Sequence, residues 1–323
     1  MQTCRPKHNV PMARPLHDES NGSRLSKMSP CGTLGRYAGN TRLICNGRWI
    51  IGPEQWPSLI TLLLFIAPCV LFAIFTCPFL WHHVHPAVPI IFAYMAAIAL
   101  ASMLKTSFTD PGIIPRYLHA STVDAAAATT DPQGLHYREV QIKGRSWSLK
   151  YCDTCQIFRP PRASHCRQCD NCVECEDHHC IWLNNCIGKR NYRSFFAFIT
   201  TCTLLCLYLV GCCIAHVLLS VPSSVHDRSF HDMFIHAPVS FCLAIVCFVL
   251  LWMVGSLTLF HCWLIARGVT THEQLRARIM RARGYPSSSP YKSNNPLMNA
   301  VQAICQYRPI SYIRTIQQGN RDI

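Results

Sequence analysis

The stretch PSLITLLLFIAPCVLFAIFTCPFL, residues 57–80, is 24 residues long and carries no charged side chain. As an α-helix that rises about 1.5 Å per residue, it can cross a hydrocarbon layer about 30 Å thick. Three more uncharged stretches follow at residues 87–104, 194–221 and 237–265. Buried helices of a soluble protein rarely run this long without a polar face. The sequence therefore predicts an all-α integral membrane protein whose four transmembrane helices occupy these ranges.

The composition of the whole chain points the same way. Of its 323 residues, 50% are hydrophobic and 14% are charged, and the mean hydropathy is +0.15. A soluble globular protein is about one quarter charged, and a disordered chain is poor in hydrophobic residues. Both classes are excluded for the chain as a whole.

The distribution of basic residues predicts how the chain is oriented. Of the 30 Lys and Arg residues, eight precede residue 56, twelve lie within residues 105–193 and nine follow residue 266. Four crossings place these three groups on one side of the membrane, and the positive-inside rule identifies that side as the cytosol. The net charge of +14 is then explained by topology and by attraction to anionic lipid, so no nucleic-acid partner is needed.

The four spans divide the chain into cytosolic segments of different composition. Residues 1–56 form an N-terminal region that is rich in Ser, Pro, Arg and Asn up to about residue 37, which predicts disorder there. Residues 105–193 form a loop whose last part, about 150–193, is rich in cysteine, and residues 266–323 form a tail. The first apolar run starts too far into the chain and is too long for a cleaved signal peptide. Both chain ends are therefore expected in the cytosol.

Cysteine is concentrated between the second and third spans. Eight of the 21 cysteines and three histidines lie within the 35 residues 152–186. The cytosol is reducing, so such a cluster indicates metal binding or thiol chemistry rather than disulfides. Pairs of the form Cys-x2-Cys suit tetrahedral zinc, because a tight turn brings two thiolates onto one ion at roughly 2.3 Å. The candidate ligands are Cys152, Cys155, His165, Cys166, Cys169, Cys172, Cys175, His178, His179, Cys180 and Cys186.

Counting these ligands separates metal binding from other chemistry. Two structural zinc ions need eight of the eleven candidates, which leaves three. Asp177, His178 and Cys180 are close in sequence and supply an orienting carboxylate, a base and a nucleophile, the parts that make a thiolate reactive. The spacing leaves open whether the two zinc sites follow one another or interleave, although adjacent His165 and Cys166 are more easily assigned to different ions.

The motifs around this cluster resemble the DHHC family of protein S-acyltransferases. The Asp177-His178-His179-Cys180 motif carries the resemblance first, and it is followed by Asn184-Asn185-Cys186-Ile187-Gly188 and by Asn191-Tyr192-Arg193. Three further stretches extend it, since Asp110-Pro111-Gly112 is similar to the family's DPG motif, Thr270-Thr271-His272-Glu273 to its TTxE motif and residues 299–305 to its C-terminal Asn-containing motif. The resemblance covers roughly residues 36–305. It implies four spanning helices with a cytosolic zinc-binding domain between the second and third.

The resemblance also implies a role for each residue of the cluster. One zinc ion is expected on Cys152, Cys155, His165 and Cys172, and the other on Cys166, Cys169, His179 and Cys186. Cys180 is then the acyl-accepting nucleophile, His178 its general base and Asp177 the carboxylate that orients His178. Family members take a long-chain acyl group such as palmitoyl from acyl-CoA and pass it, through an acyl-cysteine intermediate, to cysteines of membrane-associated proteins.

Finer similarities indicate a subfamily. Gly39-Asn40-Thr41, Asn46-Gly47-Arg48, Gly52-Pro53 and residues 107–116 resemble the group that contains fungal and animal Ras acyltransferases and many plant members. The resemblance implies residence in the ER, the Golgi or another endomembrane and the use of a small accessory subunit. The protein substrate, the preferred acyl length and the oligomeric state are left open.

The position of Cys180 in the chain fits a reaction at the membrane surface. It precedes Ser194, the first residue of the third span, by 14 residues. Trp182, Phe195 and Phe198 are expected to line the mouth of an acyl-chain cavity among the helices. Basic residues nearby, Lys189, Arg190 or Arg193, are expected to attract the phosphates of CoA.

Three residues of this region carry open alternatives. Ile181 stands where family members have Pro, which predicts a looser turn and an altered rate. Cys175 is interpreted as a second acylation site, a redox-sensitive thiol or a small packing residue. His261, near the end of the fourth span, is predicted to be an interface histidine rather than a ligand.

A competing function is a membrane-anchored zinc-binding scaffold or ubiquitin-ligase adaptor. Such a module needs the eight zinc ligands but not the additional group formed by Asp177, His178 and Cys180. A transporter is a third hypothesis, and the four spans contain no Asp, Glu, Lys or Arg to line an ion path. The sequence favours the acyltransferase.

Overall fold

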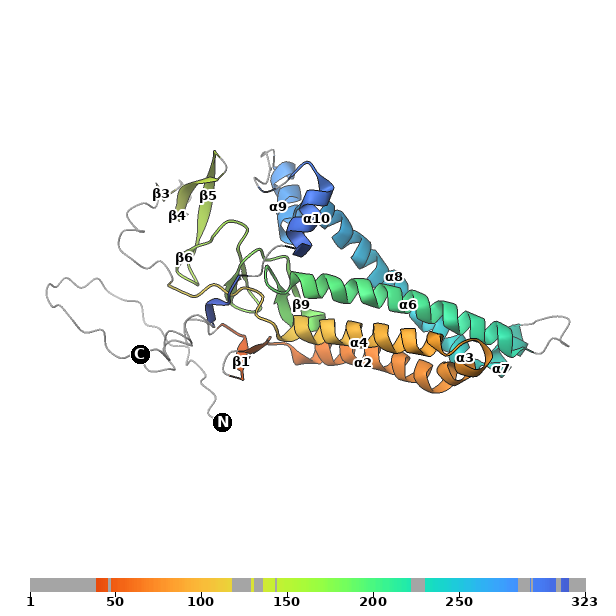
Figure 1. Cartoon of the computed structure of the whole chain (residues 1–323). Helices are drawn as coiled ribbons and strands as arrows, with labels where there is room; N and C mark the ends of the chain where they lie inside the picture. The colour runs from red at the N-terminus through yellow and green to blue at the C-terminus, as the bar shows by residue number, and fades with distance from the viewer. Residues whose placement is uncertain are drawn as a thin grey trace.

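A computed structural model of the chain describes residues 39–45, 48–117, 129–130, 136–142, 144–221, 230–283, 291, 293–305 and 309–313. The N-terminal segment for which the sequence predicts disorder lies outside these ranges. Four helices in the described part are long and apolar enough to cross a membrane. They run side by side, and a domain of short strands lies at one end of the bundle (Figure 1).

The first spanning helix extends over Gln55–His83 and is not uniform. Its parts are α2 (Gln55–Leu71), the π-helical turn η2 (Phe72–Thr76) and α3 (Cys77–His83). In a π-helical turn the backbone hydrogen bonds span five residues instead of four, which widens the helix locally. Here the turn buries the side chains of Phe72 and Thr76.

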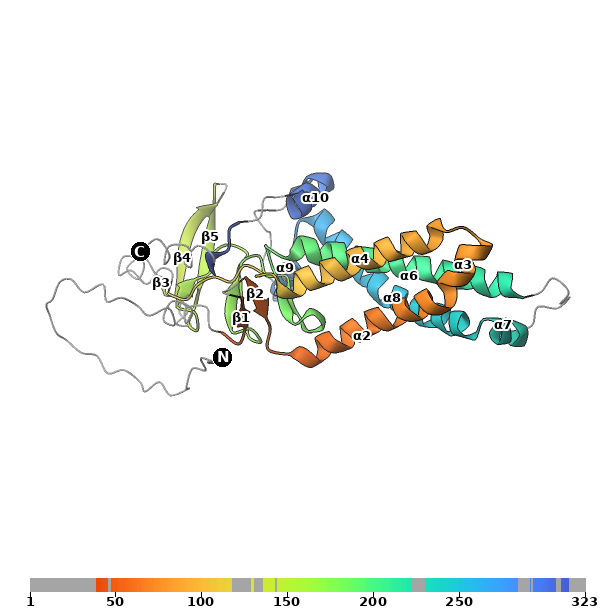
Figure 2. The same cartoon turned by 60° about the horizontal axis from the view of Figure 1, so that its bottom comes forward.

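The other three spanning helices extend slightly beyond the uncharged sequence. They are α4 (Ala87–Phe108), α6 (Tyr192–Ser220) and α8 (Pro238–Arg267). Of the three, α6 packs against both α4 and α8. Figure 2 shows α2 set apart from α4 along most of its length, with α3 next to the start of α4. The protein is therefore a multi-pass membrane protein with α6 in the middle of its bundle.

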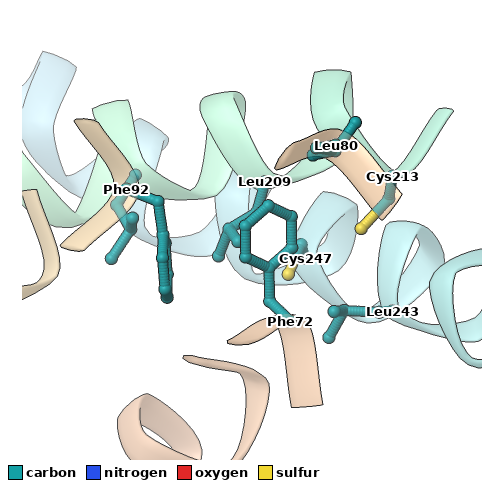
Figure 3. Packing of buried hydrophobic residues seen from close by; sticks show 8 residues of the cluster. Phe72, Leu80, Phe92, Leu209, Cys213, Leu243 and Cys247 are labelled. Carbon is teal, nitrogen blue, oxygen red and sulfur yellow. The ribbon is translucent and has the colours of Figure 1, made fainter. Parts of the chain in front are cut away.

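Apolar side chains from several helices fill the half of the bundle that lies away from the strands. The rings of Phe72 and Phe92 contact each other at an angle of 53°, with centroids 4.7 Å apart. The ring of Phe72 also lies next to Leu209 and Cys247 (Figure 3). A polar network adjoins this cluster, in which the Ser240 hydroxyl lies 2.7 Å from both the Thr76 hydroxyl and Nδ1 of His216. Polar side chains satisfied in this way are tolerated at membrane depth.

The domain between α4 and α6 is built from short antiparallel strands. The sequence-based description of an all-α protein thus holds for the membrane part, whereas the zinc-binding domain adds small sheets. Its larger sheet contains β3 (Thr129–Thr130), β4 (His136–Ile142), β5 (Arg145–Cys152) and β6 (Ile157–Phe158). Two hairpins follow. The first pairs β7 (Ser164–Cys166) with β8 (Asn171–Val173), and the second pairs β9 (His178–Cys180) with β10 (Asn185–Ile187). The helical turn η3 (Ile181–Leu183) connects β9 to β10 and contacts α2.

Chain segments that precede the first span and follow the fourth also lie at the end of the bundle that carries the zinc-binding domain. Before the first span, β1 (Arg42–Ile44) pairs with β2 (Trp49–Ile51). After the fourth span, α8 ends at Gly268, whose φ of +65° is readily adopted only by glycine, and α9 (Thr271–Ala282) and α10 (Pro296–Cys305) follow. At the opposite end, α7 (Phe230–His236) precedes α8.

Asparagine side chains attach the zinc-binding domain to the end of α4. The side-chain amide of Asn185 donates to the backbone carbonyls of Thr106, Ser107 and Thr109 at 2.8–3.1 Å. Asn191 likewise donates to Thr106 and Cys186. These bonds satisfy carbonyl groups that a helix end leaves free, and they fix the domain against the membrane helices.

Candidate active site and zinc sites

The first set of predicted zinc ligands comes together at one point. One side-chain ligand atom from each of Cys152, Cys155, His165 and Cys172 lies within 4.8 Å of the others. Nδ1 of His165 is 3.6, 3.4 and 3.8 Å from the three sulfurs. A tetrahedral zinc ion with bonds of about 2.3 Å to sulfur and 2.0 to 2.1 Å to nitrogen requires separations of about 3.6 Å. The set fits a structural zinc ion.

The second set has the same geometry. Cys166, Cys169, His179 and Cys186 also bring their ligand atoms within 4.8 Å of one another. Nδ1 of His179 lies 3.6, 3.3 and 3.5 Å from the three sulfurs. The two clusters therefore fit two structural zinc ions.

The strand register explains why neighbouring residues belong to different clusters. In the β7/β8 hairpin His165 lies directly opposite Cys172, and in the β9/β10 hairpin His179 lies opposite Cys186, so each hairpin supplies one ligand pair. Successive side chains of a strand point to opposite faces. Cys166, the neighbour of His165, consequently faces the other cluster, and the two sites interleave.

The same alternation separates the three residues of β9. His179 faces the second zinc cluster, so its neighbours His178 and Cys180 share the opposite face of the strand. That face lies against the membrane helices. Cys180 is 8% exposed and belongs to a buried cluster with Met103 of α4 and Phe195 of α6. The strand thus presents an imidazole and a thiol together, away from the metal.

The carboxylate of Asp177 is held by three hydrogen bonds. Nδ1 of His178 lies 2.7 Å from Oδ2, the hydroxyl of Thr271 donates to the same oxygen at 2.7 Å, and the backbone N–H of Thr271 donates to Oδ1 at 2.9 Å. The side chain of Asp177 is 1% exposed. Because both oxygens are held, the imidazole of His178 has a fixed orientation.

The charges of this pair stabilise each other. Burial acts to raise the pKa of Asp177, but the hydrogen bond and positive charge of His178 and the N–H of Thr271 outweigh it and leave the pKa below its usual value. For His178, burial acts to lower the pKa, whereas the hydrogen bonds to Asp177 and Cys180 and their charges raise it to about 9. An imidazole with this affinity for a proton can take one from a neighbouring thiol.

Two residues of the TTxE motif have separate tasks. Thr271 binds Asp177, while both carboxylate oxygens of Glu273 accept from Arg162 at 2.8 Å. Glu273 also completes a capping box with Thr270 at the start of α9. Arg162 precedes the zinc ligands of β7, so the ion pair joins the zinc-binding domain to the segment that follows α8.

The DPG motif and the C-terminal Asn motif also make internal contacts. Oδ1 of Asp110 accepts from the backbone N–H groups of Gly112 and Ile113 at 2.8 and 3.0 Å. The amide of Asn299 donates to the carbonyl of Ala266 at 2.9 Å, next to the C-terminus of α8, and Gly268 lies so close that a Cβ there would be 2.9 Å from the Asn299 side chain. Both motifs therefore fix segments that leave the membrane helices.

The residues expected to meet the acyl donor differ in their surroundings. Trp182 is 49% exposed and Phe195 is 1% exposed, and Phe198 packs at the edge of the cluster around Cys180. Arg190 is engaged internally, because it donates to the carbonyl of Pro309 at 2.6 Å and lies 3.3 Å from Oδ2 of Asp110.

The other two basic candidates are more open. Lys189 lies 3.5 Å from a carboxylate oxygen of Glu174 and its side chain is 36% exposed, while Arg193 is exposed.

Cys175 is half-buried, and burial raises the pKa of its thiol, although the positive charges of Arg162 and Lys189 act to lower it. A raised pKa makes a thiol less reactive, which favours the packing role among the three interpretations of Cys175.

Sequence reasoning did not assign partners to Tyr192 and His261. The hydroxyl of Tyr192 lies 3.1 Å from Nδ1 of His261, and His261 lies beside Asp177 and His178. The two residues are 69 positions apart. Tyr192 belongs to the Asn191-Tyr192-Arg193 motif, but nothing in the sequence pairs it with His261. Their pairing depends on how α6 packs on α8.

Comparisons with known proteins agree with this architecture. The family model described as DHHC palmitoyltransferase matches residues 146–278. Palmitoyltransferase ZDHHC18-A of Danio rerio is 37% identical over 306 residues, which is 90% of this chain and 65% of the relative. Palmitoyltransferase ZDHHC18 of Mus musculus is 36% identical over 86% of this chain and 74% of the relative, and palmitoyltransferase erf2 of Emericella nidulans is 37% identical over 86% of this chain and 47% of the relative.

The chain thus spans slightly less than two thirds of the zebrafish relative, about half of the fungal one and nearly three quarters of the mouse one. The matched residues include both zinc clusters, the Asp177–His178 pair and Cys180. With four spanning helices and the Cys-rich domain between the second and third, the chain belongs to the DHHC palmitoyltransferase family of protein S-acyltransferases.

Proposed function

We propose that Cys180 accepts a palmitoyl group from palmitoyl-CoA and passes it to a cysteine of a membrane-associated protein. His178 is the general base and Asp177 orients it. The observation that carries this proposal is the 2.7 Å contact between His178 and a carboxylate of Asp177 that is held on its other side by Thr271. The placement of Cys180 on the same face of β9 as His178 supports it.

In the first step, His178 takes the proton of the Cys180 thiol and the thiolate attacks the carbonyl carbon of the acyl-CoA thioester. The bond between that carbon and the CoA sulfur breaks, and the CoA thiolate leaves with the proton that His178 held. In the second step, His178 takes the proton of the acceptor thiol, which attacks the acyl-Cys180 thioester. Cys180 leaves as a thiolate and recovers the proton. Both steps exchange one thioester for another, so the residues supply mainly proximity and proton transfer.

The apolar surroundings of Cys180 suit a hydrocarbon chain. The cluster around it receives side chains from all four spanning helices, Leu62, Met103, Phe195 and Val254 among them. We infer that the chain enters between the helices past Trp182, Phe195 and Phe198. Of the three basic candidates Arg190 is bonded internally, which leaves Lys189 and Arg193 to attract the phosphates of CoA.

The zinc ions have a structural role in this proposal. Each cluster has four protein ligands and so leaves no position for substrate, as in closed structural sites. Cys152, Cys155, His165 and Cys172 hold one ion, and Cys166, Cys169, His179 and Cys186 hold the other. They stiffen a domain whose strands are only two to eight residues long.

The charge distribution supports an orientation with both chain ends, the zinc-binding domain and Cys180 in the cytosol. We further propose that the protein resides in the ER, the Golgi or another endomembrane and works with a small accessory subunit, on the basis of its likeness to the Ras-acyltransferase group.

The decisive experiment incubates the purified full-length protein with a clickable palmitoyl-CoA. A hydroxylamine-labile label on the wild type that is absent from Cys180→Ser is the expected result. Label that persists in Cys180→Ser contradicts the assignment of the nucleophile. No label on the wild type, with and without co-expressed accessory subunit, supports the zinc-binding scaffold instead. Cys262→Ser, which changes an exposed thiol on α8, is the matched control and is expected to keep the label.

A further inference from the structure

A second buried histidine lies next to the Asp177–His178 pair. One ring nitrogen of His261, one of His178 and a carboxylate oxygen of Asp177 all lie within 4.8 Å of one another, and the centroids of the two imidazole rings are 6.0 Å apart. His261 is 1% exposed and belongs to α8, whereas the pair lies at the start of β9 in the zinc-binding domain. A membrane helix therefore contributes a polar side chain directly behind the proposed base.

The ring of His261 is held in place by α6. The hydroxyl of Tyr192, the first residue of α6, lies 3.1 Å from its Nδ1. Phe195, one turn further along, packs edge-on against both imidazoles, with centroid distances of 5.0 Å to His261 and 5.3 Å to His178. Tyr192 thus fixes His261 by a hydrogen bond, and the ring of Phe195 contacts both histidines.

The hydrogen-bonding capacity of Asp177 leaves room for His261. An ionised carboxylate has about four acceptor positions, and Oδ2 is used by His178 and the Thr271 hydroxyl while Oδ1 is used by the Thr271 N–H. A neutral imidazole has one donor and one acceptor. When Tyr192 donates to Nδ1 of His261, the hydrogen of the neutral imidazole is on Nε2. The nearby carboxylate of Asp177 is negatively charged and is therefore a favourable acceptor for this N–H.

The same three side chains carry the donor atoms of a metal site. However, both oxygens of Asp177 and Nδ1 of His178 already take part in hydrogen bonds. A metal ion would have to break these bonds, and with them the orientation of His178. The contacts therefore favour a hydrogen-bonded group over a third metal site.

We propose that His261, held by Tyr192, is a positioning residue that keeps the Asp177–His178 pair in register with Cys180. The inference rests on the proposed function, because it requires that His178 acts on Cys180. Thr271 holds the carboxylate from the side of α9, and His261 holds it from the side of α8. The pair is clamped between the membrane bundle and the segment that follows it.

The test measures two rates on the purified full-length protein and on three variants, His261→Leu, His261→Gln and Tyr192→Phe. The first rate is alkylation of Cys180 by iodoacetamide, followed by mass spectrometry of the peptide that contains it. The second is acylation of Cys180 in a single turnover over a range of palmitoyl-CoA concentrations. Both report on Cys180, but only the second depends on the acyl donor.

His261→Leu is expected to slow both rates roughly ten- to a hundredfold, the range typical for loss of an outer hydrogen-bond partner of a functional group. The concentration of palmitoyl-CoA that gives half the maximal rate should stay unchanged, because His261 does not meet the donor. His261→Gln keeps an N–H donor and should recover most of the rate. Tyr192→Phe should slow the rates less, and the double variant should be no slower than His261→Leu alone, because the tyrosine acts through the histidine.

His216 provides the matched control. It is also a buried histidine of the bundle, 9% exposed and hydrogen-bonded to Ser240, and it packs in the cluster away from Cys180. His216→Leu should leave the alkylation rate of Cys180 unchanged. Zinc content and elution volume show which variants are folded, and if His261→Leu is unfolded, Tyr192→Phe decides, because it removes a single oxygen.

Two results overturn the inference. One is a His261→Leu protein whose Cys180 is alkylated as fast as in the wild type or in His216→Leu. The other is a His261→Gln protein that is as slow as His261→Leu, which indicates a role in packing. Failure of the proposed function gives a different result, because the wild type then never takes the palmitoyl label. The alkylation rates of Cys180 in the wild type and the His261 variants can still be compared in that case.

Discussion

Thr271 and Asp177 are joined by two hydrogen bonds, one from the threonine hydroxyl to Oδ2 at 2.7 Å and one from the backbone N–H to Oδ1 at 2.9 Å. Thr271 is the first residue of α9. The N-terminus of a helix carries a partial positive charge, which stabilises an anion next to it. The charge and orientation of Asp177 thus depend on a helix that begins 94 residues later in the chain.

Thr271→Val tests the hydroxyl alone, since valine has the same shape and keeps the backbone N–H. A hydrogen bond to a charged group contributes about 1.5 to 3 kcal/mol, so we expect single-turnover acylation of Cys180 to slow at least about tenfold. Thr271→Ser should restore most of the rate. Thr200→Val is the control, because the buried Thr200 hydroxyl has no hydrogen-bond partner in the described part of the chain. Equal rates in Thr271→Val and Thr200→Val would show that the hydroxyl has no role.

The ion pair of Arg162 and Glu273 is expected to hold the zinc-binding domain against α9. Glu273→Gln keeps the capping box at the start of α9, since glutamine serves there as well, but it removes the charge. We expect a lower thermal unfolding midpoint in detergent, from a loss of about 1 to 2 kcal/mol for a partly exposed charged pair.

Arg162→Lys separates charge from geometry in the same assay. Lysine keeps the positive charge but not the two parallel N–H groups that meet both oxygens of Glu273. Its midpoint should lie below that of the wild type, and adding Glu273→Gln should lower it little further. Fully additive effects of the two substitutions would show that the residues do not act as a pair.

Zinc content distinguishes the ligands from their neighbours. The wild type should contain two zinc ions per chain, as the two four-ligand clusters require. Cys172→Ser should lower the zinc content and the rate of acylation, whereas Cys175→Ser, three residues further on, should keep both ions. Because adjacent residues of β7 serve different clusters, loss at one site should loosen the other, and chelation should release both ions together. A Cys172→Ser protein with full zinc content contradicts the ligand set.

The turn after Cys180 accommodates the proline that family members have. Cys180 has an extended backbone, with φ −97° and ψ 102°, the conformation that a following proline requires. Ile181 is the first residue of η3, where a helix tolerates proline. We expect Ile181→Pro to keep its zinc and to acylate Cys180 at the wild-type rate or faster, because the turn becomes stiffer. A slower, fully zinc-loaded variant would show that this chain has adapted to isoleucine.

The spanning helices were predictable because lipid excludes charge from about 20 consecutive residues. The ends of these helices were less predictable, since a helix can include charged residues beyond the apolar stretch. Lys105 lies within α4, Arg193 lies within α6 and Arg267 is the last residue of α8. The π-helical turn at Phe72–Thr76 left no mark in the sequence. It depends on how α2 and α3 pack against the other helices.

At the site, the local pairs were predictable and the distant ones were not. Asp177 and His178 are adjacent, and the family pattern indicates which Cys and His residues form each zinc cluster. Thr271, which holds Asp177, and His261, which lies beside it, come from α9 and α8, whose positions depend on side-chain packing across the bundle. Thr271 was marked by a motif, whereas His261 was not.

The burial of Cys180 among side chains of all four spanning helices also determines how an acceptor finds it. Because the thiol lies where the spanning helices meet the zinc-binding domain, we expect a protein that is already attached to the same membrane to reach it by diffusing in two dimensions. Confinement to one surface raises the effective concentration of such a protein far above its average in the cell. The rate of transfer should therefore follow the surface density of the acceptor, and anchoring to the right membrane should select substrates as strongly as the sequence around their cysteines.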